Sequence, residues 1–399
     1  METLPSVSFL DSIHAALGPL IAMLLEESVQ VREMAAFAVG RLAQNVDNQA
    51  GIVQAGGLQP LISLLGSKYL NSQHNAAFAL YGLSDNDDNV PYFLKSGCVS
   101  LLLNGKFHVQ ASKDCVRNTL KKLEEKIAQA HVLHHLKYLL SSEASDLATK
   151  YYIATGLAFL APQAALYNVF MENRGMDVLF FHALNSGCFH CQKESIDAIH
   201  SLGKRSKAFA KLPTIEHGVK PGVYEAPPSA SFLGGHYLDC DKFSDVTFVV
   251  ENRRIKAHKI ALLAASHKAV EILGEDSSVI VIKDVGFQTW MTVLQFIYSG
   301  KVHITENDNT HELLVQAERL QLDGLKYACE TFLISTIDAQ SVAMIYDLAT
   351  ECNTCYLHKA AVWYTISEYS RLVKVLGQAT VSTMLTKMFD TFIASLTFK

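Results

Sequence analysis

Residues 35–39 read Ala-Ala-Phe-Ala-Val, and residues 76–80 read Ala-Ala-Phe-Ala-Leu, so that the two stretches differ by a constant offset (76 − 35 = 41). The match extends well beyond these five positions, in the same register. The same offset pairs Leu42 with Leu83, Asp47 with Asp88, Asn48 with Asn89 and Gly56 with Gly97. Agreement over so long a stretch indicates an internal repeat, and a period of this length is typical of arrays of stacked helices.

The composition of the repeat explains why it would stack. Small Ala residues allow two helices to approach closely, and Leu and Val at helical spacing form a stripe that only a neighbouring unit can bury. The Asp/Asn cluster at residues 85–89 is suited to end one helix and cap the next. Weaker copies end at Leu160 and Leu202, which are separated by a similar offset (202 − 160 = 42). We therefore predict an α-solenoid of about four to five repeats over residues 1–212.

Two details of this array are expected from spacing. The segment 54–61, which contains Gly56-Gly57, is expected to be the turn that opens the next repeat. The copy around Gln110 to Leu123 is expected to be shortened, because residues 98–107 are too few for a full set of helices.

Residues 73–83 resemble the third helix of an armadillo repeat, and this resemblance implies a groove that binds extended peptides or helices. In importin-like arrays an aromatic residue and an Asn recur four residues apart along that groove. The aromatic position matches here, but Arg41 and Gly82 stand at Asn positions, so nuclear-import cargo is not expected. The candidate partner-binding residues are Phe37, Arg41, Gln73, Asn75, Phe78 and Gly82. The alternative is that Phe37 and Phe78 pack between repeats.

After a Pro- and Gly-rich stretch at 213–235, expected to be an exposed linker, the hydrophobic period changes. Strands are predicted at 245–250, 254–258 and 279–282, with a tight turn at 251–253. Helices are predicted at 259–266, 287–298 and 312–320, and a helical tail follows from Ala339. The fold class is therefore mainly α, with an α/β domain in the second half.

The motifs Ser244–Phe248, Ala257–Ser266 and Leu294–Gly300 resemble those of a BTB/POZ domain. That resemblance implies homodimerisation, docking of protein partners and, in many members, recruitment of a cullin scaffold of RING ubiquitin ligases. The expected division of the chain is an armadillo array at 1–212, a linker at 213–235, a BTB/POZ domain at 236–338 and a helical BACK-like extension at 339–399.

Two groups of residues are singled out in the BTB-like domain. Asp245 and His258 are polar residues in apolar segments, and the resemblance places them near the dimer-facing pocket. The structural alternative is that Asp245 caps the entry to the strand and that His258 is a hydrogen-bonded core residue. Val270, Glu271 and Leu273 lie where relatives contact a cullin, but the segment 267–278 is shorter here and has no Phe, which leaves cullin recruitment open.

Together, the two parts resemble a plant family of armadillo–BTB proteins whose best-known members bind bZIP transcription factors of the abscisic-acid response. The resemblance implies a non-catalytic adaptor of the nucleus and cytoplasm that binds a transcription factor and dimerises or serves ubiquitylation. A transcriptional co-regulator without a ubiquitin role is the alternative on the same scaffold. Relatives have longer arrays, so the array is expected to be shortened at the N-terminus.

A zinc-binding or hydrolytic enzyme is the alternative of another class. Cys352, Cys355 and His358 have partial metal spacing, and Cys188-x-x-Cys191 could be a second pair, but the two groups fall in different domains. His131, His134 and His135 have no nucleophile in a recognisable motif. The 8 Cys follow no disulfide pattern, and a net charge of −5 with pI about 6.3 argues against nucleic-acid binding. No cofactor or metal is predicted.

Overall fold

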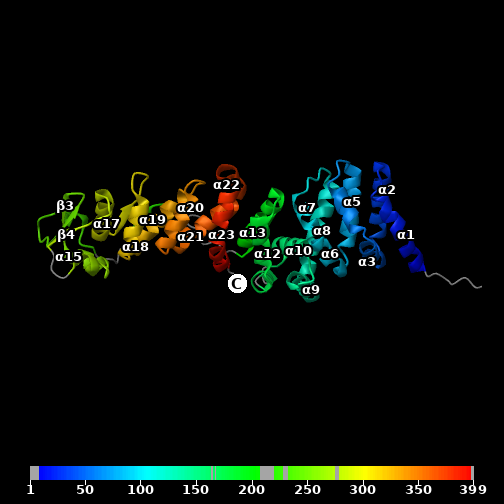
Figure 1. Ribbon diagram of the computed structural model, residues 1–399, viewed down its shortest axis with the longest axis horizontal. Helices are drawn as coiled ribbons and strands as arrows, with labels where there is room; N and C mark the ends of the chain where they lie inside the picture. The colour runs from blue at the N-terminus through cyan, green and yellow to red at the C-terminus, as the bar shows by residue number, and fades with distance from the viewer. Residues whose placement is uncertain are drawn as a thin grey trace, which may run out of the picture. The chain divides into compact units, whose positions relative to one another are not determined.

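The computed structural model describes residues 9–162, 165–166, 168–206, 220–227, 232–274 and 278–396. The chain divides into two compact units, one ending at Ser206 and the other running from Lys207 to Leu396. Figure 1 shows helices throughout the first unit, and strands together with helices in the second. The predicted mainly α class, with an α/β domain in the second half, is confirmed.

The first unit is built from short and long helices in alternation. Their bounds are α1 Phe9–Met23, α2 Val29–Leu42, α3 Val46–Gln54, α4 Leu58–Leu65, α5 Leu70–Leu83, η1 Asp87–Asn89, α6 Val90–Lys95, α7 Cys98–Asn104, α8 Gln110–Ile127, α9 Ala130–Ser141, α10 Leu147–Leu160, η2 Asn168–Glu172, α12 Gly175–Asn185 and α13 Phe189–Arg205. The first and last residues of α2 and α5 differ by the offset of the repeat. Successive long helices pack on one another, α2 on α5, α5 on α8 and α10 on α13.

The Asp/Asn cluster ends one helix and starts the next in both copies of the repeat. Asn48 Nδ2 donates a hydrogen bond of 3.1 Å to the carbonyl of Leu42, the last residue of α2. Asn89 Nδ2 donates to the carbonyl of Leu83, the last residue of α5, at 2.9 Å. The side chain of Asn86 then caps η1 by accepting from the backbone of Asp88. The predicted capping role of this cluster is confirmed.

Two predicted details of the array are wrong. The Gly56-Gly57 turn joins α3 to α4 inside one unit and does not open the next one. The copy ending in α8 is also not shortened, because η1 with α6, then α7, then α8 supply a complete set of helices. The chain uses helices of six and seven residues for α6 and α7, and the long α8 provides much of the packing surface.

The second unit begins with strands and ends in helices. The bounds are β1 Val223–Glu225, η3 Gly235–Tyr237, β2 Val246–Val250, β3 Arg253–Ala257, α15 Lys259–Ala265, α16 Ala269–Leu273, β4 Val279–Val281, α17 Phe287–Ser299, β5 Lys301–His303, α18 Thr310–Arg319, α19 Asp323–Ser335, α20 Val342–Glu351, α21 Cys355–Ser367, α22 Tyr369–Leu376 and α23 Gln378–Ser395. The predicted strands and helices agree to within two residues with β2, β3, β4, α15, α17 and α18, whereas β1 and β5 were not predicted.

A three-stranded sheet of order β3-β2-β4 lies in this unit, with β2 antiparallel to β3 and parallel to β4. The turn between β2 and β3 holds Glu251 and Asn252 at φ of 48° and 63°, the left-handed pair that a two-residue hairpin with correct twist needs. Alternate residues of β2 are buried, among them Phe248, which meets the ring of Trp290 edge-on at 5.4 Å. This contact anchors the sheet to α17.

The prediction of an exposed linker is wrong for residues 220–227. Strand β1 pairs in antiparallel register with β5, so that Tyr224 lies opposite Val302. The ring of Tyr224 packs on Gly324 and lies 5.9 Å from the ring of Phe296. A further hydrogen bond joins the backbone of Gly222 to Thr331 Oγ1 at 3.1 Å. Residues 213–219 and 228–231 of the predicted linker lie outside the described residues, whereas 232–235 is described, with Phe232 and Leu233 exposed and the backbone N–H of Gly234 donating to the carbonyl of Tyr298 at 2.9 Å.

The helical tail is confirmed as far as Leu396, the last described residue. Val342, Ile345, Tyr346 and Leu348 of α20 form its buried face, as the sequence pattern indicates. Across the described parts of both units, none of the helices combines the length and apolar character that crossing a bilayer requires.

Candidate functional site

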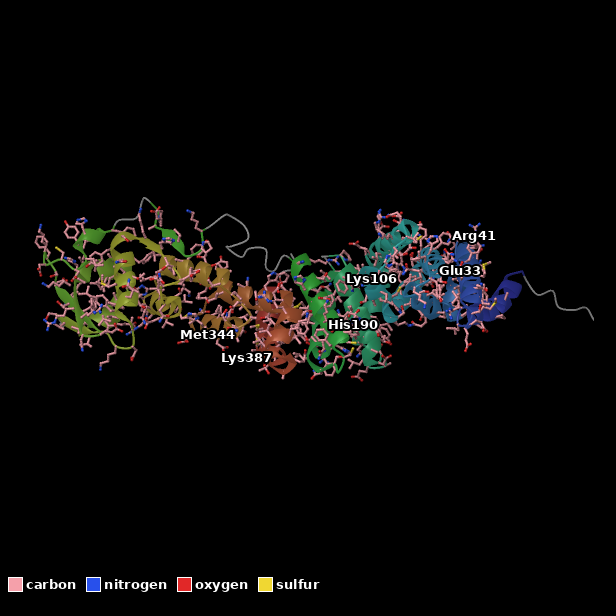
Figure 2. The ribbon with its side chains drawn as sticks, turned by 90° about the horizontal axis from the view of Figure 1, so that it is seen from above. Glu33, Arg41, Lys106, His190, Met344 and Lys387 are labelled. Carbon is pink, nitrogen blue, oxygen red and sulfur yellow. The ribbon has the colours of Figure 1, made fainter. Side chains whose placement is uncertain are left out.

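The outer surface of α2 carries an uncovered stripe of side chains. Gln30, Met34, Phe37 and Arg41 are all exposed and follow one another at intervals of four, three and four residues, which places them on one helix face. Met34 is 62% exposed and Phe37 48% exposed, so both large apolar side chains are open to solvent. Arg41 forms no ion pair with any described residue. Figure 2 labels Arg41 and, on the same helix, Glu33.

The residues of α5 that are equivalent to this stripe, one repeat later, are partly buried against α2. Phe78 is half-buried and lies so close to Gly40 that a side chain there would meet its ring at 2.9 Å. Asn75 Nδ2 donates to the carbonyl of Glu33 at 3.1 Å, and Asn71 donates to the carboxylate of Glu33 at the same distance. These contacts fix α5 against α2, so only part of Phe78 is available to a partner.

Gln73 and Gly82 require correction as partner-binding candidates. Gln73 is 4% exposed, and its amide donates to the carbonyls of Leu65 at 2.8 Å and Lys106 at 3.1 Å. Gly82 faces α2 so closely that an added Cβ would meet the carbonyl oxygen of Ala43 at 2.8 Å. Both positions hold neighbouring helices together. The accessible surface is therefore centred on Phe37 and Arg41, and Met34, which the sequence reasoning missed, belongs to it.

Cationic side chains near the ends of the long helices α8 and α13 donate hydrogen bonds to backbone carbonyls of an earlier long helix. Lys122 Nζ donates to the carbonyl of Tyr81 at 3.2 Å, pairs with Asp85 at 2.7 Å and lies 3.4 Å from the centre of the Tyr81 ring. Arg205 donates to the carbonyls of Phe159, Leu160 and Ala161, which end α10. These cations satisfy helix C-termini.

His258 is a buried and fully hydrogen-bonded residue of the second unit. It is 5% exposed, with Nδ1 at 2.8 Å from the hydroxyl of Tyr298 and Nε2 at 2.8 Å from the carbonyl of Lys242. Burial raises the pKa of Tyr298 to about 12, so its hydroxyl stays protonated. Asp245 Oδ1 accepts from the backbone of Lys259 at 2.7 Å and so caps α15. The geometry of His258 matches the structural alternative, whereas the Asp245 side chain caps α15 and not the strand entry. A role of either residue in dimer pairing stays a prediction.

The cullin-facing candidates separate into two kinds. Val270 is 59% exposed, and the carboxylate of Glu271 is exposed and pairs with Lys268 at 2.7 Å. Leu273 is 4% exposed and belongs to the hydrophobic core, so it cannot contact a partner without local unfolding. Leu273 is therefore corrected to a core residue, because α16 is short and only its outer face is accessible.

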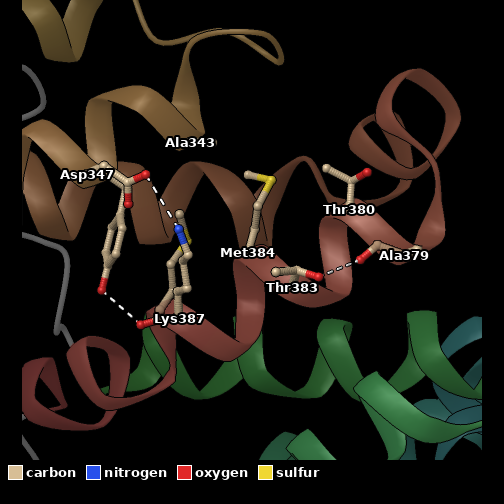
Figure 3. A pocket seen from close by; sticks show the side chains of 9 residues that line it. Ala343, Asp347, Ala379, Thr380, Thr383, Met384 and Lys387 are labelled. Atoms are coloured by element: carbon tan, nitrogen blue, oxygen red, sulfur yellow. Dashed lines mark hydrogen bonds and ion pairs between the residues drawn. The ribbon is translucent and has the colours of Figure 1, made fainter.

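A cavity of about 370 Å³ lies between α20 and α23 (Figure 3). Its wall is mainly apolar, with Met384 at its centre in the view, while Lys387 pairs with Asp347 at 3.5 Å and accepts from the hydroxyl of Tyr346 through its carbonyl. Asp347 is the one carboxylate among its described lining residues, and none of them carries a thiol. The mainly apolar wall suits the cavity to accept an apolar group.

The metal candidates do not form a ligand set. Cys352 is 1% exposed at the end of α20, and His358 Nε2 lies 2.8 Å from Thr350 Oγ1. On the other unit, His131 Nε2 lies 3.9 Å from Asp87, which already pairs with Lys126. Among the residues with described positions, no three His, Cys, Asp or Glu side chains come together as metal ligands would.

Known proteins resemble the chain across both of its units. The family described as BTB/POZ domain matches residues 235–337. "ARM repeat protein interacting with ABF2" of Arabidopsis thaliana is 38% identical over 84% of this chain and 46% of its own length. "Armadillo BTB Arabidopsis protein 1" is 35% identical over 86% of this chain and 46% of its own. The chain thus spans about half the length of the curated relatives it matches.

Two further similarities each cover only part of the chain. "Longitudinals lacking protein-like" of Drosophila melanogaster is 34% identical over 93 residues, which are 23% of this chain and 72% of that protein. A designed armadillo repeat protein for modular peptide recognition aligns with 50% of this chain and 93% of its own at 16% identity and a TM-score of 0.27. Repeated three-helix units precede a BTB/POZ domain here, and both Arabidopsis relatives match across the two, so the chain is similar to armadillo-repeat BTB/POZ proteins over both of its units.

Proposed function

We propose that the protein is a non-catalytic adaptor that binds a partner protein on its armadillo unit and links it to a second protein through its BTB domain. The observation that carries the proposal is the uncovered stripe of Met34, Phe37 and Arg41 on α2. Exposed apolar side chains beside a cation are the composition of protein-binding surfaces, in which aromatic residues, Met and Arg are enriched. Residence in the nucleus and cytoplasm is part of the same proposal.

The chemistry of the stripe defines the class of partner. Phe37 and Met34 favour a segment with apolar side chains, and Met adapts to irregular shapes. Arg41 favours a carboxylate next to those side chains. Because Gly82 stands at the second Asn position and is covered by α2, a ladder of amides along a peptide backbone is not expected. An amphipathic helix with an acidic edge fits best.

A transcription factor is the proposed partner, and ABF2, which one relative is named for binding, is the first probe. The test measures binding of purified ABF2 to the full chain by calorimetry. Substitution Phe37→Ala combined with Arg41→Glu should weaken binding at least about tenfold, because it removes the apolar contact and reverses the charge. Tyr138→Ala is the matched control, since Tyr138 is 62% exposed on α9 and outside the stripe.

The possible outcomes separate the parts of this proposal. ABF2 binding that is equal in the native chain and in the double variant would place the partner surface elsewhere. Absence of ABF2 binding by the native chain would contradict the choice of partner. Binding lost in both the double variant and the Tyr138 control would point to instability of the unit, which circular dichroism of each variant would reveal.

For the BTB domain we propose homodimerisation or cullin recruitment, with exposed Val270 of α16 as the contact for a cullin. Val270→Arg should abolish capture of a cullin by the full chain, because it places a charge on an apolar contact. Val375→Arg is the control, since Val375 is 55% exposed on α22. If the native chain captures no cullin, the alternative of a co-regulator without a ubiquitin role is favoured. Light scattering of the same proteins tests dimerisation.

A further inference from the structure

The first turn of α13 carries two cysteines three residues apart. Cys188 is the N-cap of the helix, with extended backbone at φ −108° and ψ 115°, and its side chain is exposed. Cys191 occupies the third helical position and is partly buried. Cys188 and Cys191 are the N-cap and the third residue of α13, so both thiols belong to the first turn of the helix, where the backbone N–H groups are not used in helical hydrogen bonds. Figure 2 labels His190, which stands between them.

The pKa values of the two thiols are shifted in opposite directions. The backbone N–H groups of Cys191 and His190 lower the pKa of Cys188, and the side chain of Cys191 adds to this. Burial raises the pKa of Cys191, with a smaller contribution from Cys188 itself. An exposed thiol that ionises more readily, beside a partly covered thiol that ionises less readily, is the arrangement in which the first attacks and the second resolves.

A buried carboxylate lies one helical turn after Cys191. Glu194 is 9% exposed, and the hydroxyl of Tyr151 donates to its Oε2 at 2.7 Å and also approaches the carbonyl of Cys191 at 3.3 Å. The ring of His182 covers Tyr151 at 4.3 Å between ring centres. Residues three apart on a helix share a face, so the Glu194 carboxylate lies on the Cys191 side of α13.

The chain contains a second Cys-x-x-Cys of different geometry, which serves as an internal control. Cys352 ends α20 and is 1% exposed, whereas Cys355 is exposed at the start of α21. Burial raises the pKa of Cys352 to about 11. The two sulfur atoms therefore belong to different helices and different environments, although the spacing in sequence is the same.

We propose that Cys188 and Cys191 form a redox-active dithiol that exchanges with low-molecular-weight disulfides such as glutathione disulfide. The Cys188 thiolate attacks one sulfur of glutathione disulfide, forming a mixed disulfide and releasing one glutathione thiolate. Cys191 then passes its proton to Glu194 and attacks the Cys188 sulfur, which closes the intramolecular disulfide and releases the second glutathione thiolate; this thiolate takes up the proton. Two protein thiols are oxidised while one disulfide is reduced to two thiols.

The test incubates the reduced full chain in glutathione buffers of increasing oxidised fraction, followed by alkylation and peptide mass analysis. The expected result is a disulfide between Cys188 and Cys191 at ratios that leave Cys352 and Cys355 alkylated. Cys191→Ser should stop as a glutathione adduct on Cys188, and Cys188→Ser should slow formation of any adduct in this turn at least about tenfold. Equal oxidation of the two Cys-x-x-Cys pairs, or no adduct on Cys188 in Cys191→Ser, would overturn the proposal.

The role of Glu194 has a separate readout. Glu194→Gln keeps a hydrogen-bond acceptor for Tyr151 but cannot take a proton at neutral pH. The mixed disulfide should then accumulate on Cys188, because the resolving step slows while the first attack keeps its rate. Equal rates of both steps in Glu194→Gln and the native chain would remove Glu194 from the scheme. Circular dichroism of each variant checks that α13 is retained.

Discussion

Asn89 shows how one side chain can define a repeat. It is 2% exposed, and its Nδ2 donates to the carbonyls of Leu83 at 2.9 Å and Gln49 at 3.3 Å. The carbonyl of Leu83 is left without a helical partner at the end of α5, and water cannot reach it. Asn48 makes the equivalent bond to Leu42 one repeat earlier. Asn therefore recurs at this position because each repeat has a buried helix C-terminal carbonyl that needs a hydrogen-bond donor.

Asn89→Ala should lower the free energy of unfolding of the first unit by about 2 kcal/mol, because it leaves a buried carbonyl without a donor. Urea unfolding followed by circular dichroism measures this change. Asn71→Ala is the control, since Asn71 is exposed and bonds only the side chain of Glu33, and it should stay within about 0.5 kcal/mol. Equal effects of the two substitutions would contradict the assignment.

Glu330 on α19 gives the second unit a dependence on pH. It is 5% exposed, its Oε2 has no hydrogen-bond partner among the described residues, and burial raises its pKa to about 7. In the unfolded chain the carboxyl ionises near 4.5, so between these values the folded state holds one proton more. Stability from this group therefore falls as pH rises from about 4.5 to about 7 and is constant above.

Glu330→Gln should stabilise the second unit at pH 8 by up to about 3 kcal/mol, because the amide carries no charge to bury. At pH 5 the gain should fall below about 1 kcal/mol, since the native side chain is then protonated in the folded state. Urea unfolding at the two pH values measures the difference. Glu351→Gln, at an exposed position of α20, should show no such dependence. A gain that is the same at pH 5 and pH 8 would be inconsistent with a protonated Glu330.

At the scale of elements, Gly82 sets the distance between α2 and α5. A Cβ at this position would meet the carbonyl oxygen of Ala43 and the amide nitrogen of Gln44, both at 2.8 Å. Gly82→Ala should cost about 1–3 kcal/mol of unfolding free energy, because the backbone of α2 must move. Gly66→Ala is the control, with its nearest atom at an ordinary 3.6 Å. Thermal unfolding should show a lower midpoint for the first variant only.

Strand β1 is the second element whose role depends on one side chain. Tyr224 contacts Gly324 and the rings of Phe296 and Tyr327. Tyr224→Ala should lower the free energy of unfolding of the second unit by about 2 kcal/mol, since it empties a half-buried site. Glu225→Ala, which removes only an exposed ion pair with Lys301, should change it by less than about 0.5 kcal/mol. Chemical unfolding of both variants measures these changes. A loss of unfolding free energy for Tyr224→Ala as small as for Glu225→Ala would show that β1 does not contribute to the stability of the domain.

At the scale of the whole molecule, each unit has its own core, and substitutions should act on one unit at a time. Asn89→Ala is expected to accelerate amide hydrogen exchange in peptides of α3 to α8 and to leave β2 and α17 unchanged. Tyr224→Ala should accelerate amide hydrogen exchange in peptides of the second unit and leave the exchange of α3 to α8 unchanged. Exchange that rises throughout the chain for either variant would show one cooperative unit instead of two.

The local parts of the fold could be predicted because their signals are local. The offset of the repeat relates the ends of α2 to those of α5. The apolar residues that alternate in 246–250 predict the strand β2 and the face of it that is buried. The left-handed turn at Glu251-Asn252 follows a β-branched run and is also recognisable from neighbours in sequence. Such features depend on hydrogen bonds and spacings within one or two elements.

The candidate site was predicted less well, because exposure depends on what lies opposite a residue. Gln73 and Phe37 both belong to third helices, yet Gln73 is covered by the chain near Leu65 and Lys106 while Phe37 is left open. Leu273 has the same hydrophobic character as Val270 but faces the core. The helical period gives each residue a face, but only the packed neighbours decide which face is covered.

The family resemblance, the two-part architecture and the order of helices and strands can all be deduced from the amino-acid order, since they follow from repeats, motifs and periodicity. The membership of β1 in the BTB unit required the folded chain, because its partner β5 lies far along the sequence (301 − 225 = 76) and no local pattern records the pairing. Packing also distinguished two Cys-x-x-Cys pairs of identical spacing, because a thiol's reactivity depends on the helix end, burial and carboxylate around it.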